Sequence, residues 1–162
     1  MQKVHIVFIL LLLSSLAIFA DERANFQGEW SFNKSKSEFG QGGDRFVPIK
    51  LRVEHNDSIM TIERTFQREY NDDFVDTMTF TLDGSENHSE FWNSPRVISA
   101  HWSEDGQALT INTRITFTWE DEPSTVRSTD TWQLDGDMLS REFAVDGRMG
   151  RLEAIYVFSR TN

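Results

Sequence analysis

The stretch RVISAHWSEDGQALTINTRITFTW, residues 96–119, contains the pattern that decides the fold. Two runs, residues 96–102 and 108–119, are rich in Ile, Val, Thr and Trp and alternate apolar with polar side chains. This alternation has the period of a half-buried strand. Between the runs lies Asp105-Gly106, a pair that accepts the positive φ angles of a hairpin turn. The stretch therefore predicts two antiparallel strands joined by a tight turn.

The same pattern extends along the chain in both directions from this hairpin. Further Asp-Gly pairs at residues 83–84, 135–136 and 146–147 mark tight turns, which imply antiparallel pairing in chain order. Closing such a sheet on itself removes its exposed edges. We therefore expect an all-β fold, an antiparallel up-and-down meander of about ten strands closed into a barrel. The runs expected to form strands are residues 28–33, 49–55, 59–67, 74–82, 87–92, 96–102, 108–119, 125–134, 138–145 and 151–158.

The first twenty residues have the features of an export signal. An apolar run from Ile6 to about Leu13 follows a short, partly polar start, and small residues place cleavage after Ala17 or Ala20. The run is shorter than the roughly 20 residues that a spanning helix prefers. We expect residues 1–20 to be a signal peptide and residues 21–162 to form one domain. The protein is then periplasmic or secreted, without stable membrane insertion.

Composition and motifs exclude several classes of function. A formal net charge of −10 argues against nucleic acid or anionic lipid as a partner, because both need a basic surface. The chain has no Cys, and His55, His88 and His101 lie in separate runs without metal-ligand spacing. There is no glycine-rich phosphate loop or nucleophile elbow. We expect a non-enzymatic protein without a metal or cofactor.

The start of the first expected strand is similar to that of lipocalin-like proteins. Phe26-x-Gly28-x-Trp30, followed by Asn33 and Lys34-Ser35, resembles the opening of that group, part of the wider calycins. More closely, the chain after residue 20 resembles a class of small exported bacterial lipocalin-like proteins. The further segments that carry this resemblance are Ile62–Thr65, Thr81–Gly84, Trp102–Ile111 and a closing aromatic strand.

The resemblance implies roles for three residues at the closed end of a lipocalin-like barrel. In calycins a Gly-x-Trp opens the first strand there, which is the position of Gly28 and Trp30. A basic residue near the end of the last strand packs across that Trp, which implies a cation–π contact between Arg160 and Trp30. One departure is the loop at residues 33–48, which is short and glycine-rich where fatty-acid-binding proteins place a two-helix lid. In a closed barrel, such a loop is expected to lie over one mouth.

Two arginines lie on otherwise apolar faces of expected strands. Arg64 alternates with Phe66, and Arg141 alternates with Phe143, so each pair shares a face. A guanidinium inside a barrel can bind a carboxylate through two parallel hydrogen bonds. These four residues are therefore the candidate ligand-binding residues for a small hydrophobic or acidic amphipathic molecule.

Two other interpretations of these arginines stay open at this point. Each arginine can form an internal salt bridge, with Asp76, Asp130 or Glu142 as partner, because an unpaired buried charge is costly. A slip of one residue in strand register would instead turn both arginines toward water. The numerous Trp and Phe side chains either fill the barrel or line a cavity in it.

Binding is thus the expected function, and the alternatives differ in what is bound. The first alternative is an interaction module that docks a partner through its barrel mouth or acidic face. The charged strand face of Lys50, Arg52 and Glu54 and the loop with Gly40, Gly42 and Gly43 are compatible with this function. A second is an outer-membrane barrel, which the polar side chains His55, Arg64 and Asp76 on the apolar faces oppose. A third is an isomerase or hydrolase with a lipocalin-like pocket, for which no residues stand out.

Overall fold

The computed structural model describes residues 23–161 with gaps at 42, 45–46, 70–71 and 149. The expected signal peptide lies outside the described residues, as does Gly42. In the described part, no helix is long and apolar enough to span a membrane. The elements are β1 (Gly28–Phe32), a 3-10 turn (Lys34–Lys36), β2 (Lys50–His55), β3 (Ile59–Phe66), β4 (Phe74–Thr81), β5 (Asn87–Phe91), β6 (Ser94–Trp102), β7 (Ala108–Trp119), β8 (Glu122–Asp135), β9 (Met138–Gly147) and β10 (Gly150–Thr161).

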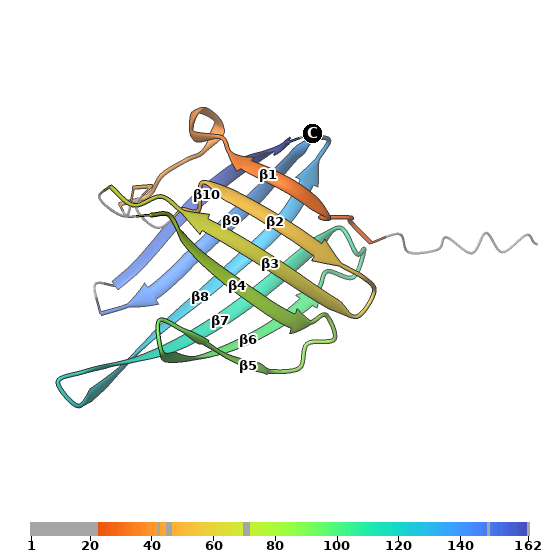
Figure 1. The fold of residues 1–162 in the computed structure, drawn as a ribbon. Helices are drawn as coiled ribbons and strands as arrows, with labels where there is room; N and C mark the ends of the chain where they lie inside the picture. Colours follow the sequence, from red (N-terminus) through yellow and green to blue (C-terminus); the bar gives the residue numbers. More distant parts are fainter. Residues whose placement is uncertain (1–22, 42, 45–46, 70–71, 149, 162) are drawn as a thin grey trace, which may run out of the picture.

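The ten strands form one antiparallel sheet that curves into a barrel (Figure 1). The sheet order is β4-β3-β2-β1-β10-β9-β8-β7-β6-β5, so the first strand pairs with the last and brings Trp30 opposite Arg160. The predicted all-β meander is confirmed, and most strand limits agree within two residues. β8 starts earlier and β10 ends later than expected, because their ladders continue to Trp119↔Glu122 and Glu29↔Thr161.

The barrel departs from full closure at one boundary, which we call the seam. β4 and β5 stand at the two ends of the sheet order and share no ladder in the described structure. Where β4 ends and β5 begins, the side chain of Asn87 occupies the Thr81 amide, a backbone donor that a ladder would use. The Thr81 amide donates to Asn87 Oδ1 at 3.3 Å, and Asn87 Nδ2 donates to Thr81 Oγ1 at 3.1 Å.

One end of the barrel, the closed end, contains the packed core. It carries the β2–β3, β6–β7 and β8–β9 turns and the segment before β1. From that segment Phe26 enters the barrel, where it is fully buried between Trp102 and Trp132 with both ring centroids at 5.7 Å. The largest fully buried apolar side chains are Phe26, Trp30, Leu51, Met60, Ile62, Phe80, Ile98, Leu109, Ile111, Trp132 and Phe158.

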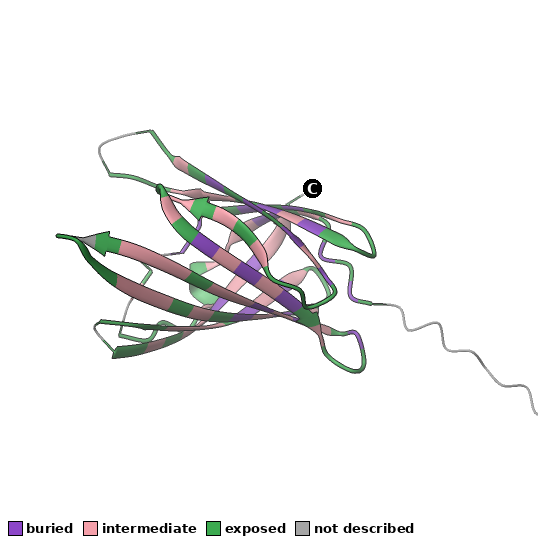
Figure 2. Ribbon diagram, turned by 90° about the horizontal axis from the view of Figure 1, so that it is seen from below, coloured by how far each residue is buried: buried purple, intermediate pink, exposed green. Residues whose placement is uncertain are grey.

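The opposite end, which we call the mouth, is less densely filled. Inward-facing positions follow from alternation with the buried residues of each strand. At the mouth these positions are Phe66, Phe74, Val126 and Val145, and all four are only half-buried. Figure 2 shows the buried positions concentrated along the barrel body and toward the end where the chain enters, with intermediate positions dominating the long hairpin at the other end. Solvent therefore reaches the interior from the mouth.

Candidate functional site

Between the closed end and the mouth lies a cluster of charged side chains that we call the arginine layer. It consists of Arg64, Arg96, Arg141, Asp76 and Asp130. All five belong to strands, and each alternates with buried apolar residues, so the sheet register fixes them inward. The pKa of Arg64 is lowered by burial; Asp76 opposes this, and Arg141 and Arg96 add to the lowering. Arg64 is therefore close enough to both other arginines to be repelled by them.

Arg64 pairs with its cross-strand neighbour on β4. Its register partner is Asp76, whose Oδ2 accepts hydrogen bonds from Arg64 Nε at 3.1 Å and from Nη2. The Arg64 side chain remains 19% exposed, whereas that of Asp76 is 6% exposed. Arg64 is thus on the solvent-facing side of the layer. Of the interpretations of Arg64 left open by the sequence, the geometry supports the internal salt bridge, with Asp76 as partner.

Arg96 was not among the residues singled out from the sequence, although it belongs to the site. It extends from β6 across the seam, where Nη1 donates to both carboxylate oxygens of Asp76 at 2.9 and 2.8 Å. Its Nη2 donates to the Thr77 carbonyl at 3.0 Å, and its Nε donates to Ser89 Oγ at 2.9 Å. The sequence alone indicates that Arg96 faces inward, because it lies two residues before the buried Ile98 on the same strand.

Arg141 forms the second salt bridge of the layer. Its Nε donates to both oxygens of Asp130 at 3.2 Å, and its Nη2 also binds that carboxylate. The guanidinium carbon lies 5.3 Å from the Trp132 ring centroid and 5.4 Å from that of Phe158, which adds cation–π attraction. Glu142, the other partner considered, is exposed on the outer face of β9.

The layer has donors and positive charge in excess. Three guanidinium groups face two carboxylates, so one cation is left without a full counter-charge. Among the described residues, three buried side-chain atoms lack any hydrogen-bond partner: Trp102 Nε1, Trp132 Nε1 and Arg141 Nη1. All three are N–H donors. A buried donor left without an acceptor costs about 1–3 kcal/mol, so a group that brought acceptor atoms to these donors would be stabilised here.

The candidate aromatic residues lie next to the arginines, on the mouth side. Phe66 follows Arg64 on the same face of β3, with the guanidinium carbon 5.6 Å from its ring centroid. Phe143 follows Arg141 on β9 and packs against Tyr156 with centroids 5.9 Å apart. Burial raises the pKa of Tyr156, and Arg141 opposes this shift. The structure therefore places all four sequence-selected residues between the core and the mouth.

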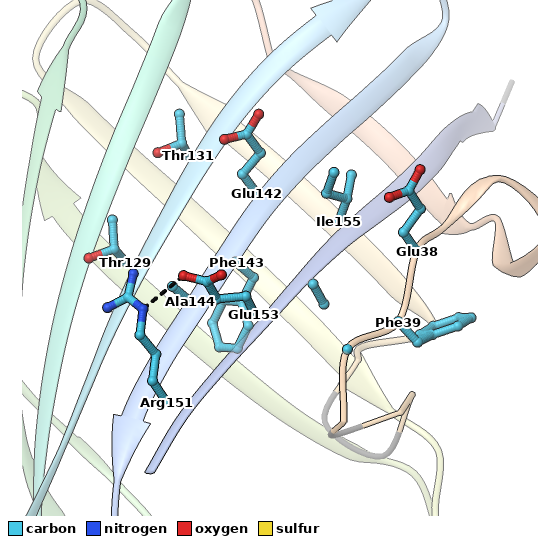
Figure 3. Close-up of a pocket in the computed structure, with 12 residues that line it drawn as sticks. Glu38, Phe39, Thr129, Thr131, Glu142, Phe143, Ala144, Arg151, Glu153 and Ile155 are labelled. Atoms are coloured by element: carbon cyan, nitrogen blue, oxygen red, sulfur yellow. Dashed lines mark hydrogen bonds and ion pairs between the residues drawn. The ribbon is translucent and has the colours of Figure 1, made fainter.

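Two hollows adjoin this region, and they lie on opposite faces of the same strands. A cavity of about 20 Å³ inside the mouth is covered by Gly40 and Gly43 and lined by Phe143 and Tyr156. A larger hollow of about 680 Å³ lies on the outer face of β8, β9 and β10, below the segment 38–40 (Figure 3). The cavity inside the mouth is far smaller than the several hundred Å³ that a lipid-sized ligand needs.

The loop predicted to cover a mouth is held at its start against β10. The backbones of Glu38 and Ile155 exchange hydrogen bonds of 2.8 and 2.9 Å. A Cβ on Gly40 would lie 1.9 Å from the Glu153 carbonyl oxygen, so only glycine allows this close approach. Phe39 packs on Tyr156 at 6.3 Å between centroids. The loop thus closes the β10 side of the mouth.

At the closed end, the structure brings together the three residues assigned to barrel closure. The Arg160 guanidinium carbon lies 4.2 Å from the Trp30 ring centroid, and Arg160 Nη1 donates to the Gln27 carbonyl at 2.6 Å. Gly28 has a φ of +133°, and a Cβ there would lie 2.6 Å from Arg160 Nη1. Trp30 Nε1 donates to the Phe26 carbonyl at 3.0 Å. Glycine at this position leaves room for the guanidinium.

Comparisons with known proteins identify the fold. No protein-family model matches the sequence, and no curated protein does. Among solved structures, the chain is similar to zebrafish ileal bile acid-binding protein complexed with cholic acid, with a TM-score of 0.54, 13% identity, and coverage of 84% of this chain and 98% of that one. It is also similar to secretory abundant heat soluble protein 4 from Ramazzottius varieornatus, with a TM-score of 0.53, 11% identity, and coverage of 84% and 94%. At these identities the likeness shows the fold alone, which is an antiparallel β-barrel of ten strands.

Proposed function

We propose that this protein is an exported, lipocalin-like binding protein that holds a small amphipathic anion in the mouth of its barrel. The observation that carries the proposal is the unbalanced arginine layer, with its surplus positive charge and its unpartnered buried donors. The chain as a whole has a net charge of −10, so the excess of cations in the interior is opposite in sign to the charge of the protein. No catalytic step is part of this proposal.

A carboxylate head group would correct both imbalances at once. It brings acceptors for Arg141 Nη1 and Trp132 Nε1, and its single charge matches the surplus cation. The half-buried Phe66 and Phe143 lie on the mouth side of the arginines, where an apolar tail would pass. The ligand would therefore lie with its head group inward and its tail toward solvent. The bile acid bound by the zebrafish neighbour has this amphipathic, anionic character.

The test compares two ligands that differ only in the head group. We expect isothermal titration to show saturable binding of a C16 carboxylic acid and binding at least about tenfold weaker for the matching alcohol, since hydrogen bonds to charged groups contribute about 1.5–3 kcal/mol. The double variant Arg141→Met/Asp130→Asn removes the unpartnered Arg141 donor but leaves Arg64 and Arg96 facing the single carboxylate of Asp76, so it should reduce the preference without abolishing it. As a matched control, Arg114→Met removes an exposed arginine on β7 and should keep it. Equal affinity for acid and alcohol in the wild type would reject the anionic ligand.

The outer hollow favours a second candidate function, a non-enzymatic interaction module. Its volume of about 680 Å³ is much larger than that of the 20 Å³ cavity inside the mouth. Glu38 and Glu142 in its lining suit a basic segment of a protein partner, whereas Glu153 already pairs with Arg151, which lines the same hollow. The face Lys50, Arg52 and Glu54 is less suited, because Arg52 and Glu54 already pair at 3.1 Å in solvent. Cross-linking from a cysteine placed at Thr131 should capture one stoichiometric partner. Capture of none would count against this function.

A further inference from the structure

We propose that the seam between β4 and β5 is a lateral gate through which the ligand reaches the arginine layer. This inference rests on the proposed function, because it concerns how the same site is filled. The seam is the place where the described sheet has no main-chain ladder. Elsewhere neighbouring strands are hydrogen-bonded; β7 and β8, for example, pair from Ala108↔Gln133 to Trp119↔Glu122.

Among the described residues, each contact across the seam involves at least one side chain, and these contacts form three groups from the closed end to the mouth. Asn87 binds Thr81 at the closed end, as described above. In the middle, Arg96 binds Asp76 and the Thr77 carbonyl. At the mouth, Phe74 of β4 packs on Phe91 of β5 and on Trp92, with centroids 6.0 and 5.2 Å apart. Parting the seam therefore breaks no strand pairing, and its main cost is the separation of the buried Arg96–Asp76 ion pair.

The middle group uses the same chemistry that would bind the ligand. Asp76 is a carboxylate shared by Arg64 and Arg96, on opposite sides of the seam. An incoming carboxylate can replace Asp76 on one arginine while Asp76 stays bound to the other. The guanidinium groups then exchange one carboxylate for another and are never left without an acceptor, so the charge cost of opening is reduced.

The mouth group supplies an apolar lip at the outer end of the seam. Trp92 is 60% exposed and stacks on Phe91 at 4.9 Å between centroids. It occupies the β5–β6 turn with a φ of +48°, next to Asn93 at +59°. Turns of this type favour Asn and Gly, so a tryptophan here is held in a strained conformation. Strained backbone positions cluster at functional sites, so we assign Trp92 a contact with the ligand.

The lip also adjoins Arg68, a cation that takes no part in the salt bridges of the arginine layer. The Arg68 guanidinium carbon lies 5.0 Å from the Phe74 ring centroid, on the exposed side of the lip. An amphipathic anion would therefore first meet apolar rings and one arginine. Beyond them lie Arg96 and Arg64, in contact with Phe91 and Phe66 respectively. The axial mouth, by contrast, is covered on its β10 side by the loop at Phe39 and Gly40.

The experiment ties the seam shut and measures how fast a ligand arrives. The double variant Phe74→Cys/Phe91→Cys is joined by a short bifunctional methanethiosulfonate, which labels only these sites because the chain has no Cys. Stopped-flow fluorescence with a dansyl-labelled C11 fatty acid gives the association rate. The matched control, Thr61→Cys/Thr79→Cys, ties β4 to β3, whose register already pairs these residues with hydroxyl oxygens 3.0 Å apart.

We expect the tied seam to slow association at least about tenfold relative to the untied form of the same variant, and reduction to restore the rate. Equilibrium affinity should change little, and the tie between β3 and β4 should have no effect on either quantity. Equal rates with the seam tied and untied would overturn the gate and leave axial access through the mouth. Absence of binding to wild-type protein would instead overturn the proposed function, and the gate with it.

A second tie covers the case in which loss of Phe74 and Phe91 weakens binding itself. Thr81→Cys/Asn87→Cys closes the other end of the seam, where the native side chains already meet, and it leaves the aromatic lip intact. The same slowing on linking, and the same recovery on reduction, are expected. Unchanged rates in both tied variants would reject the gate.

Discussion

The closed end and the mouth are built from the same strands but differ in what their inward side chains meet. On β3, Met60 and Ile62 are fully buried, whereas Phe66, four residues after Ile62 on the same face of the strand, is half-buried. On β4, Phe80 is buried and Phe74 is half-buried in the same way. Alternation is identical in both halves, so a strand pattern predicts orientation but not burial.

The arginine layer lies where the two halves meet, and the difference explains why it can be there. Toward the closed end the layer rests on packed apolar residues, which fix its geometry. Toward the mouth it is within reach of water, which lowers the cost of charge. The packed apolar core is thus concentrated at the closed end, and the charged residues border the mouth. The following experiments test that division.

Trp30→Ala is expected to have the largest effect on stability. It leaves a cavity beside Phe26 and removes the ring under Arg160, so denaturant unfolding should show a loss of about 3–5 kcal/mol. Trp92→Ala is the matched control at the mouth, because it removes the same side chain from an exposed turn. Its effect should stay within about 0.5 kcal/mol. Similar losses in the two variants would contradict the division between the ends.

Arg141→Met is expected to have the next largest effect. It leaves Asp130 buried without its cation, and we expect a loss of about 3 kcal/mol in urea unfolding. The double variant Arg141→Met/Asp130→Asn should recover part of that loss, because it removes the stranded charge. A double variant no more stable than the single one would show that the aromatic contacts of Arg141, rather than its charge, hold this part of the barrel.

Sequence alone was enough to predict the strands and their order because each tight turn limits its neighbours to one pairing. The Asp-Gly pairs and the alternation located all ten strands, and the parity of Arg64 and Arg141 indicated their inward direction. The same parity argument applies to Arg96 relative to Ile98. The partners of Arg96, Asp76 and Thr77, cannot be predicted from local pattern, because they lie across a boundary where strands adjacent in the chain do not pair.

The seam and the lip could not be predicted from local pattern. At the start of β5, the Asn87 side chain accepts a hydrogen bond from the Thr81 amide, which a ladder between β4 and β5 would otherwise use. Turn preferences do not predict whether a side chain or a neighbouring strand binds such an amide. Trp92 likewise occupies a turn position at which Asn or Gly is preferred. It is also exposed, whereas tryptophan side chains are buried on average. The empty space in the mouth is a property of packing, which alternation does not encode.

Gly28→Ala should have a smaller effect, and it tests how tightly the closed end is built. The substitution combines a φ of +133° with a Cβ that displaces Arg160 Nη1, so a loss of about 1–2 kcal/mol is expected in thermal or urea unfolding. Gly147→Ala is the control, because its Cβ meets only Val126 at an ordinary 3.6 Å. That variant should be neutral within about 0.5 kcal/mol. Equal losses would mean that Arg160 moves aside freely.

Asp83 gives the smallest effect and one that depends on pH. Hydrogen bonds from the side chain and backbone of Ser85 and from Thr81 lower the pKa of Asp83 to about 2 from its usual 3.8. The folded state thus prefers the carboxylate, and its contribution is present above the unfolded pKa and lost as pH falls from 3.8 toward 2. Asp83→Asn should therefore be slightly less stable than wild type at neutral pH and equal to it at the acid end of that range. An NMR titration of the Asp83 carboxyl that gave the ordinary pKa would show that this turn does not hold the closed end of the seam in the way the hydrogen bonds indicate.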